Sequence, residues 1–102
     1  MSEPDARDFD EWSRWFKALS DPTRLRILHH VSGLSEPAAV GEIVADLGLT
    51  QSNVSHHLKV LAGARFVLLE SAGLRTLVRA NPLCMVELPD AAAAIMQARP
   101  PS

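Results

Sequence analysis

The chain has 102 residues, of which 47% are hydrophobic and 22% are charged, the balance of one ordinary globular domain. The first twelve residues are acidic, and no apolar stretch approaches the roughly 20 residues needed to span a bilayer, so the sequence predicts neither a secretory leader nor a membrane helix. The single cysteine, Cys84, excludes an intrachain disulfide framework. We therefore expect a cytoplasmic protein with one domain over residues 1–102 and frayed tails at 1–7 and 99–102.

The formal net charge of −2 does not by itself indicate a nucleic-acid binder, but the charge is unevenly distributed. Acidic residues prevail in the first fifth of the chain. Between residues 50 and 80 four cations oppose one acid: Lys59, Arg65, Arg75 and Arg79 against Glu70. Because DNA affinity depends on local neutralisation of phosphates, such a basic lobe on an acidic body is sufficient for DNA binding.

The first predicted helix starts at Phe9 and carries an aromatic stripe. Its apolar residues recur at helical spacing: Phe9, Trp12, Trp15, Phe16 and Leu19. So many aromatic rings on one short helix indicate packing against two surfaces, one of which belongs to a partner subunit.

A clear helix start follows. Asp21 is a good N-cap, and Pro22 suits the first helical position, where its missing N–H costs nothing. Gly33 is the expected end of this second helix. The next residues, 34–38, contain a proline and are expected to form a loop.

Two further helices form a helix-turn-helix candidate. Apolar residues at i, i+3, i+4 and i+7 predict a short helix over 40–47, ended by Gly48. Thr50 then caps a helix, Thr50–Gly63, whose predicted buried stripe consists of Val54, Leu58 and Leu61. A second helix joined to the first in this way can enter the major groove of DNA.

A hairpin and a last helix complete the pattern. Strands are expected at 66–69 and 74–79 around an Ala72-Gly73 turn. Asn81-Pro82 opens a helix that runs to about Ala98 and that Pro89 is expected to kink or split. The predicted fold is mainly α with a small β-hairpin wing, a winged helix-turn-helix with the order α-α-α-α-β-β-α.

Polar side chains lie opposite the buried stripe of the helix Thr50–Gly63. The predicted DNA contacts on this helix are Gln51, Ser52, Asn53, Ser55, His56 and Lys59. The same pattern is also typical of the solvated face of an ordinary helix. The hairpin favours DNA binding, because Arg75 at its tip can reach phosphate or the minor groove. Arg79 is a further candidate, although a strand arginine is often only solvated.

Two stretches resemble the signature motifs of the ArsR/SmtB winged-helix repressors. They are FKALSDPTRLRIL at 16–28 and LGLTQSNVSHHLKVL at 47–61, and the resemblance covers roughly residues 12–81. It implies that residues 51–59 contact the major groove and that the 70–76 hairpin is the wing. It also implies a repressor that leaves its operator DNA in response to an effector.

The resemblance further implies a homodimer joined by the first and last helices, which would bind a pseudo-palindromic operator in double-stranded DNA. The predicted interface residues are Phe9, Trp12, Trp15, Phe16, Leu88, Ala92 and Ile95.

The standard metal sites of that family are not expected in this chain. Ala39 and Gly41 stand where one site has cysteines, and neither can bind a metal. Pro82 and Cys84 fall where the other has an aspartate and a histidine, and Ile95 is apolar near its more distant ligand. No cofactor is predicted, although a transition-metal effector at a non-standard site remains an alternative.

The remaining histidines and the cysteine have two interpretations each. His56 is assigned to DNA contact, and His57 either to packing or to donating one hydrogen bond. Cys84 is favoured as a small buried residue over a soft ligand or thiol sensor. A site shared between subunits, built from His29, His30, Cys84, Glu87 or the N-terminus, stays open.

No enzymatic motif is present in the sequence. There is no glycine-rich phosphate loop, nucleophile elbow or metal-hydrolase helix. Ser55 and His56 are neighbours on a helix, so their side chains diverge by about 100°. The chain is expected not to be an enzyme, and the competing hypothesis is a winged-helix module for protein–protein contact.

Overall fold

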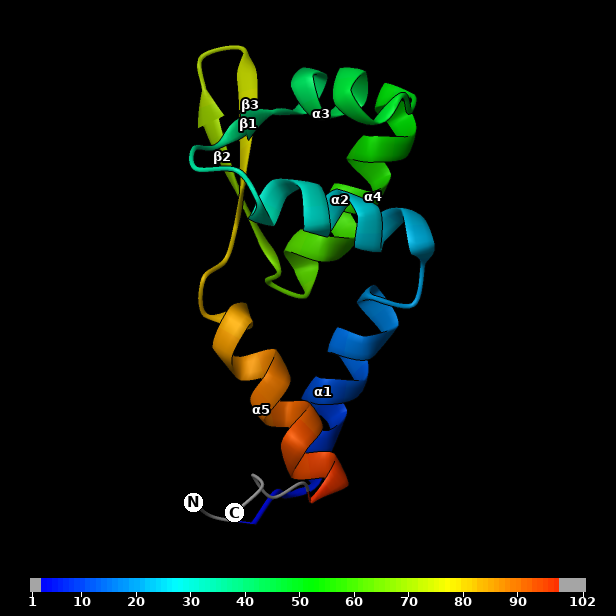
Figure 1. Ribbon diagram of the computed structural model, residues 1–102, viewed down its shortest axis with the longest axis vertical. Helices are drawn as coiled ribbons and strands as arrows, with labels where there is room; N and C mark the ends of the chain where they lie inside the picture. The colour runs from blue at the N-terminus through cyan, green and yellow to red at the C-terminus, as the bar shows by residue number, and fades with distance from the viewer. Residues whose placement is uncertain (1–2, 98–102) are drawn as a thin grey trace.

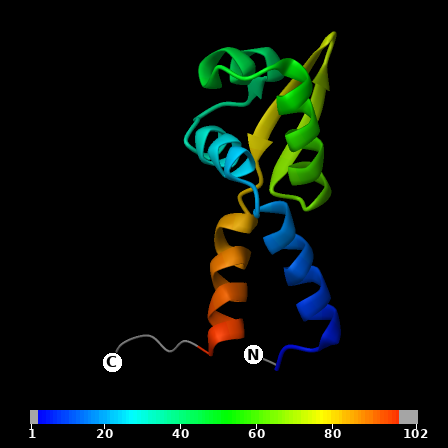
Figure 2. The ribbon, with the colours of Figure 1, turned by 90° about the vertical axis from the view of Figure 1, so that its right-hand side faces the viewer.

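The computed structural model describes residues 3–97 and has a winged helix-turn-helix architecture. Its elements follow one another as α1 (Ala6–Ala18), α2 (Pro22–Ser32), β1 (Ala38–Ala39), α3 (Val40–Leu47), α4 (Gln51–Gly63), β2 (Val67–Ala72), β3 (Arg75–Ala80) and α5 (Cys84–Met96). The three central helices and the sheet form a body, from which α1 and α5 project in the same direction (Figures 1 and 2). Within residues 3–97, no helix has the length and hydropathy to cross a membrane.

Helix α1 begins earlier than the aromatic spacing predicts. The Asp5 carboxylate accepts the backbone N–H groups of Arg7 and Asp8, and the Asp8 carboxylate accepts the N–H of Asp5. This reciprocal capping box starts the helix at Ala6. The expectation of a frayed segment over 1–7 is therefore wrong for residues 5–7, because a polar first turn carries no apolar periodicity. The other expected tail, 99–102, lies outside the described residues.

The predicted caps of α2 and α4 are confirmed. The Asp21 carboxylate accepts the N–H of Arg24 at 3.0 Å, and Pro22 occupies the first turn. The Thr50 hydroxyl oxygen accepts the N–H of Asn53 at 3.3 Å. Gly48 closes α3 in the left-handed conformation, with φ of +66°, which glycine adopts without steric cost.

The sheet has one strand more than the sequence predicts. Residues Ala38 and Ala39, placed in or next to a loop by the prediction, form the edge strand β1. It pairs with β3 through Ala38 opposite Val78, and the strand order is β1-β3-β2. Two alanines have no strand preference of their own, so this strand exists through its distant partner.

The hairpin is longer than the expected strands at 66–69 and 74–79. Strand β2 runs to Ala72, which lies opposite Arg75 at the start of β3. Gly73 and Leu74 thus form a two-residue turn, in which Gly73 has φ of +65°. Leu74, not an arginine, occupies the tip and is fully exposed.

Helix α5 differs from the prediction at its start and at its proline. The Asn81 amide oxygen accepts the N–H of Leu83 at 3.2 Å, so Asn81-Pro82 forms a turn and the helix itself begins at Cys84. The helix continues through Pro89 to Met96, and the expected split is wrong. A proline removes only one backbone donor from the helix, and the turns on both sides persist.

The core lies between the three central helices and the sheet. The predicted stripe of α4 is confirmed, since Val54 and Leu61 have 0% exposure and Leu58 has 2%. Phe66, at the end of the α4–β2 connection, is equally buried and packs edge-on against Trp15, with 6.4 Å between ring centroids. This contact attaches α1 to the body.

The cap at Asp21 should make the free energy of unfolding depend on pH. Its hydrogen bond with the Arg24 N–H, opposed by burial and aided by the nearby His57 ring and the charge of Arg24, holds the pKa of Asp21 below its ordinary value. A lowered folded-state pKa adds stability that is complete above about pH 4 and is lost as the pH falls through the folded value. Asparagine caps equally well, so Asp21→Asn isolates the charge.

We expect the free energy of unfolding of Asp21→Asn to lie below that of the parent chain at pH 7 and to converge with it as the pH falls below about 4. Urea titrations between pH 7 and 3 measure this. Asp10→Asn, in the exposed middle of α1, is the matched control. A difference that stays constant with pH would contradict the assignment.

Candidate nucleic-acid interface

The α3–α4 unit presents a helix with two contrasting faces. Thr50 caps α4 directly after the turn at Gly48, so α4 starts at a fixed angle to α3. Of the six polar residues predicted to contact DNA on this helix, Ser55 is half-buried and the other five are exposed. The exposed ones are Gln51, Ser52, Asn53, His56 and Lys59. The helix therefore buries its aliphatic side and projects short polar groups and one lysine into solvent.

His57 is the neighbour of His56 but faces inward, as the sequence predicts. It is 9% exposed, and its Nδ1 lies 3.2 Å from Nη1 of Arg24. Because a guanidinium only donates, Nδ1 is the acceptor and the ring proton is assigned to Nε2. Nε2 lies 3.9 Å from a carboxylate oxygen of Asp21. These contacts join α4 to the start of α2.

The wing arginine has a partner that the sequence does not reveal. An Nη atom of Arg75 lies 2.7 Å from Oε1 of Glu42 in the first turn of α3. Both side chains are more than half exposed, and an exposed pair of this kind contributes about 0–1 kcal/mol. The pair connects the hairpin to α3, and both side chains stay accessible to solvent. Figure 2 shows the hairpin and α3 reaching the end of the body opposite α1 and α5.

Arg79 is exposed but lies away from the tip of the hairpin. It stands opposite Leu68, at the end of the strands nearer α5. It also borders the loop before β1, near Pro37. The structure therefore does not bring Arg79 together with the polar face of α4.

The predicted dimer residues divide into three groups. Phe9, Phe16 and Ile95 are 51%, 41% and 44% exposed. Trp12 and Ala92 are half-buried, with Trp12 edge-on to Phe9 at 5.6 Å. Trp15 and Leu88 pack against the core of their own protomer, which leaves them less surface for a partner.

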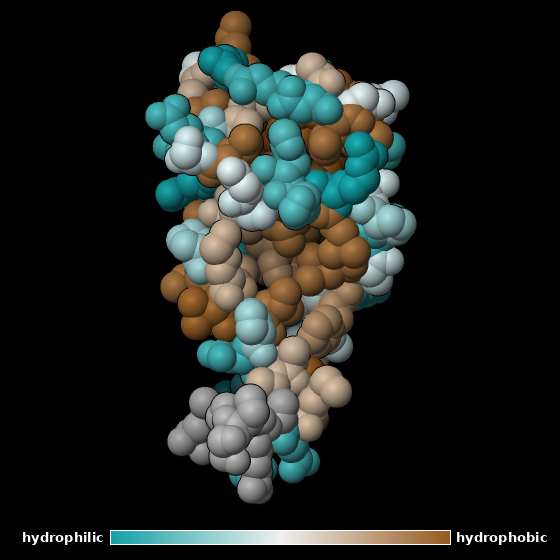
Figure 3. Space-filling view, viewed as in Figure 1, coloured by the Kyte–Doolittle hydropathy of each residue, from teal (hydrophilic) through white to brown (hydrophobic). Residues whose placement is uncertain are grey.

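The start of α5 adds apolar surface that the prediction did not include. Leu83, Met85 and Val86 are 63%, 57% and 63% exposed. Figure 3 shows hydrophobic side chains on the surface around the place where α5 leaves the body. An exposed apolar patch in this position favours a protein contact.

The structure gives limited support to metal or thiol chemistry. Among residues 3–97, no three histidine, cysteine or acidic side chains gather in a metal-binding group. His29 is exposed, whereas Nε2 of His30 lies 3.2 Å from a carboxylate oxygen of Asp46, so the two neighbours diverge. The Cys84 thiol donates to the carbonyl of Arg65 at 3.0 Å.

Cys84 is half-buried. Burial and the nearby Glu87 carboxylate raise the pKa of its thiol, against the opposing charge of Arg65. Since the thiolate is the reactive form, Cys84 is a weak nucleophile at neutral pH.

Known proteins resemble this chain in sequence and in fold. A family model described as "Bacterial regulatory protein, arsR family" matches residues 21–68. The HTH-type transcriptional regulator Rv2034 of Mycobacterium tuberculosis is 39% identical over 75 residues, covering 74% of this chain and 68% of that protein. The HTH-type transcriptional regulator CmtR of Mycobacterium bovis is 49% identical over 55 residues, covering 54% of this chain but only 45% of CmtR.

A solved structure shares the fold over almost the whole chain. It is the homodimeric winged helix-turn-helix DNA-binding domain of Mb0332 from Mycobacterium bovis, with a TM-score of 0.71 and 23% identity, covering 95% of this chain and 91% of that one. The identity to Rv2034 and the match to the family model show the family, and the structural similarity to Mb0332 shows the fold. The chain belongs to the ArsR family of bacterial regulatory proteins, DNA-binding transcriptional regulators with a winged helix-turn-helix fold.

Proposed function

We propose that the chain is a cytoplasmic repressor that binds operator DNA as a homodimer and leaves it in response to an effector. Helix α4 enters the major groove, and the β2–β3 hairpin contacts the DNA backbone or minor groove. The protein acts through DNA binding and not through catalysis. The proposal rests on one observation above all: the polar side of α4 is exposed while its aliphatic side is buried.

The same face supplies the chemistry of recognition. Amide, hydroxyl and imidazole groups can read base edges, whereas Lys59 and Arg75 can neutralise phosphates. The start of α4 adds free backbone N–H groups and the positive end of the helix dipole, which also favour phosphate. The first turn of α1, with the carboxylates of Asp5 and Asp8, lies at the other end of the molecule (Figure 1), so these two charges do not oppose the DNA.

A homodimer explains the apolar surface of α1 and α5. Pairing through Phe9, Phe16 and Ile95 would cover side chains that the protomer leaves exposed. A two-fold axis between the protomers places two recognition helices about 34–36 Å apart, one turn of B-DNA. The operator is therefore expected to be pseudo-palindromic.

Selection of bound duplexes from a random pool tests this function. We expect enrichment of a pseudo-palindrome, with an affinity that falls steeply with salt at a log–log slope of about −0.9 per phosphate contact. Ser52→Ala and His56→Ala should change the base preference. Arg75→Gln should weaken binding to all sequences and reduce the slope by about 1.

Arg79→Gln is the matched control, because it removes the same charge from the same strand far from the tip. It should leave both the affinity and the base preference unchanged. A DNA affinity that does not depend on salt, or that stays unchanged in all three variants of α4 and the wing, would contradict the proposal. Either result would favour a module for protein–protein contact.

A further inference from the structure

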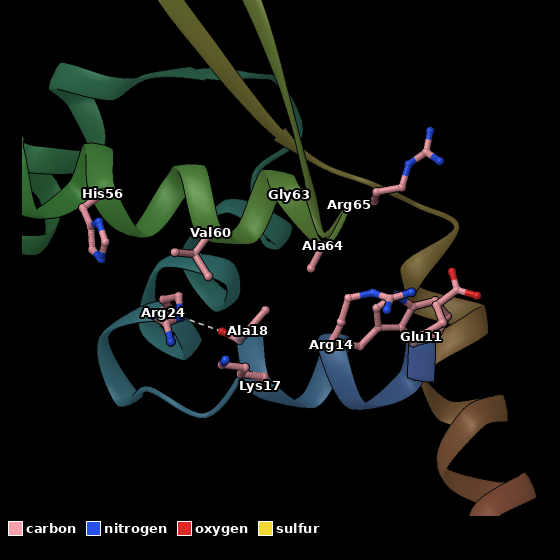
Figure 4. Close-up of a pocket in the computed structure, with 11 residues that line it drawn as sticks. Glu11, Arg14, Lys17, Ala18, Arg24, His56, Val60, Gly63, Ala64 and Arg65 are labelled. Atoms are coloured by element: carbon pink, nitrogen blue, oxygen red, sulfur yellow. Dashed lines mark hydrogen bonds between the residues drawn. The ribbon is translucent and has the colours of Figure 1, made fainter. Parts of the chain in front are cut away.

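Helices α1 and α4 enclose a cleft of about 620 Å³ that neither the DNA face nor the dimer explains (Figure 4). Its apolar lining includes Trp15 of α1, Val60 of α4 and Ala64 directly after α4. Its polar lining has four cations, one acid and one histidine. The cations are Arg14, Lys17, Arg24 and Arg65, the acid is Glu11 and the histidine is His56. A positive cleft on a chain with a net charge of −2 attracts anions.

The charges are distributed unevenly along the cleft. Figure 4 shows Lys17, Arg24 and His56 at the end near the first half of α4, while Glu11 and Arg14 lie at the other end and Arg65 points away. Arg24 is held in place, since its Nε donates to the carbonyl of Ala18 at 2.6 Å. One end of the cleft is therefore cationic and partly preorganised, and its middle is apolar.

The cleft stays accessible when the aromatic side of α1 is covered. At 3.6 residues per turn, Phe9, Trp12 and Phe16 fall on one side of α1. Glu11 and Ala18, which line the cleft, fall on the opposite side, and the lining residues Trp15 and Lys17 fall on the two flanks between. A partner that packs on Phe9, Trp12 and Phe16 would leave the side with Glu11 and Ala18 open to small molecules.

We propose that this cleft binds a small organic anion. Its carboxylate or other oxyanion head lies against Lys17 and Arg24, and its apolar part lies on Val60 and Ala64 beside Trp15. A recognition pocket of this kind typically combines apolar walls with a few polar groups that fix orientation. Because His56 belongs both to this cleft and to the DNA face, the ligand is placed to alter DNA binding. That coupling rests on the proposed function, whereas the binding itself does not.

The test uses 2-naphthoate as the probe and neutral 2-naphthamide as its uncharged match, with the full chain and no DNA. The chain has two tryptophans, so Trp12→Phe leaves Trp15 as the sole indole reporter in the cleft. We expect calorimetry to detect 2-naphthoate with at least about tenfold higher affinity than the amide, the ratio that about 1.4 kcal/mol of charge recognition gives. Trp15 emission should change on binding.

Two variants locate the probe. Lys17→Gln should weaken the affinity for 2-naphthoate about five- to tenfold. Arg7 is an exposed cation on the same helix outside the cleft, so Arg7→Gln should leave this affinity unchanged. Gly63→Leu should fill the cleft and abolish binding. A Cβ at Gly63 meets no atom within 4 Å, so this variant is expected to fold.

Several outcomes would overturn the proposal. They are equal binding of the acid and the amide, binding that Lys17→Gln does not weaken, and no binding at millimolar 2-naphthoate. If Lys17→Gln weakens the binding of duplex DNA while 2-naphthoate does not bind, the cations contact the DNA backbone instead. If 2-naphthoate binds as expected but never changes DNA affinity, the site stands and only its coupling to DNA fails.

Discussion

Phe16→Glu is expected to be monomeric at micromolar concentration and to bind DNA about a hundredfold or more weakly than the parent chain. Phe16 is 41% exposed on α1 and is part of the aromatic side of that helix. A carboxylate there would have to be desolvated in an apolar dimer contact, which costs several kcal/mol. A monomer contacts one half-site, and loss of the second contact typically removes a factor of about 10² to 10⁴ in affinity.

Sedimentation measures the assembly, and titration of the selected duplex measures the affinity. The fold should persist, because glutamate is a good helix former and the position is exposed. Arg7→Gln makes the same change in net charge on the opposite side of α1 and should stay dimeric. A Phe16→Glu variant that sediments as a dimer would place the interface elsewhere, with the apolar start of α5 as the next candidate.

Local chemistry explains which parts of the fold the sequence predicts well. Asp21 and Thr50 accept the N–H groups that open their helices, and Gly48 and Gly73 adopt the positive φ that their turns require. Each signal lies within about four residues of the structure it creates. The aliphatic stripe of α4 works in the same way, since its burial follows from its period.

Contacts distant in sequence were not predictable in this way. Strand β1 depends on Val78, which is 40 residues away from its partner Ala38. The pairing of Arg75 with Glu42 and of Arg24 with His57 each spans 33 residues. Periodicity identifies the exposed face of a helix, but it cannot identify which side chain from another element meets it. The cleft between α1 and α4 could not be predicted from the sequence for the same reason.

The second large effect concerns the same Arg24. Its backbone N–H donates to the Asp21 carboxylate, its Nε donates to the carbonyl of Ala18 at the end of α1, and its Nη1 donates to Nδ1 of His57 in α4. Arg24→Met keeps an aliphatic chain of similar length but leaves the Ala18 carbonyl and the buried His57 Nδ1 without these donors. We expect the free energy of unfolding to fall by about 2 kcal/mol, measured as the urea midpoint at an unchanged slope.

Arg26→Met is the matched control, two residues along the same helix. Arg26 is exposed and makes one long hydrogen bond, at 3.3 Å, to the carbonyl of Leu47, so its loss should change stability by no more than about 0.5 kcal/mol. Equal losses of unfolding free energy in the two variants would mean that the hydrogen bonds of Arg24 add no more stability than those of an exposed helix residue. A larger loss at Arg24 would show that its guanidinium stabilises the junction of α1 with α4 through Ala18 and His57, beside the proposed ligand cleft.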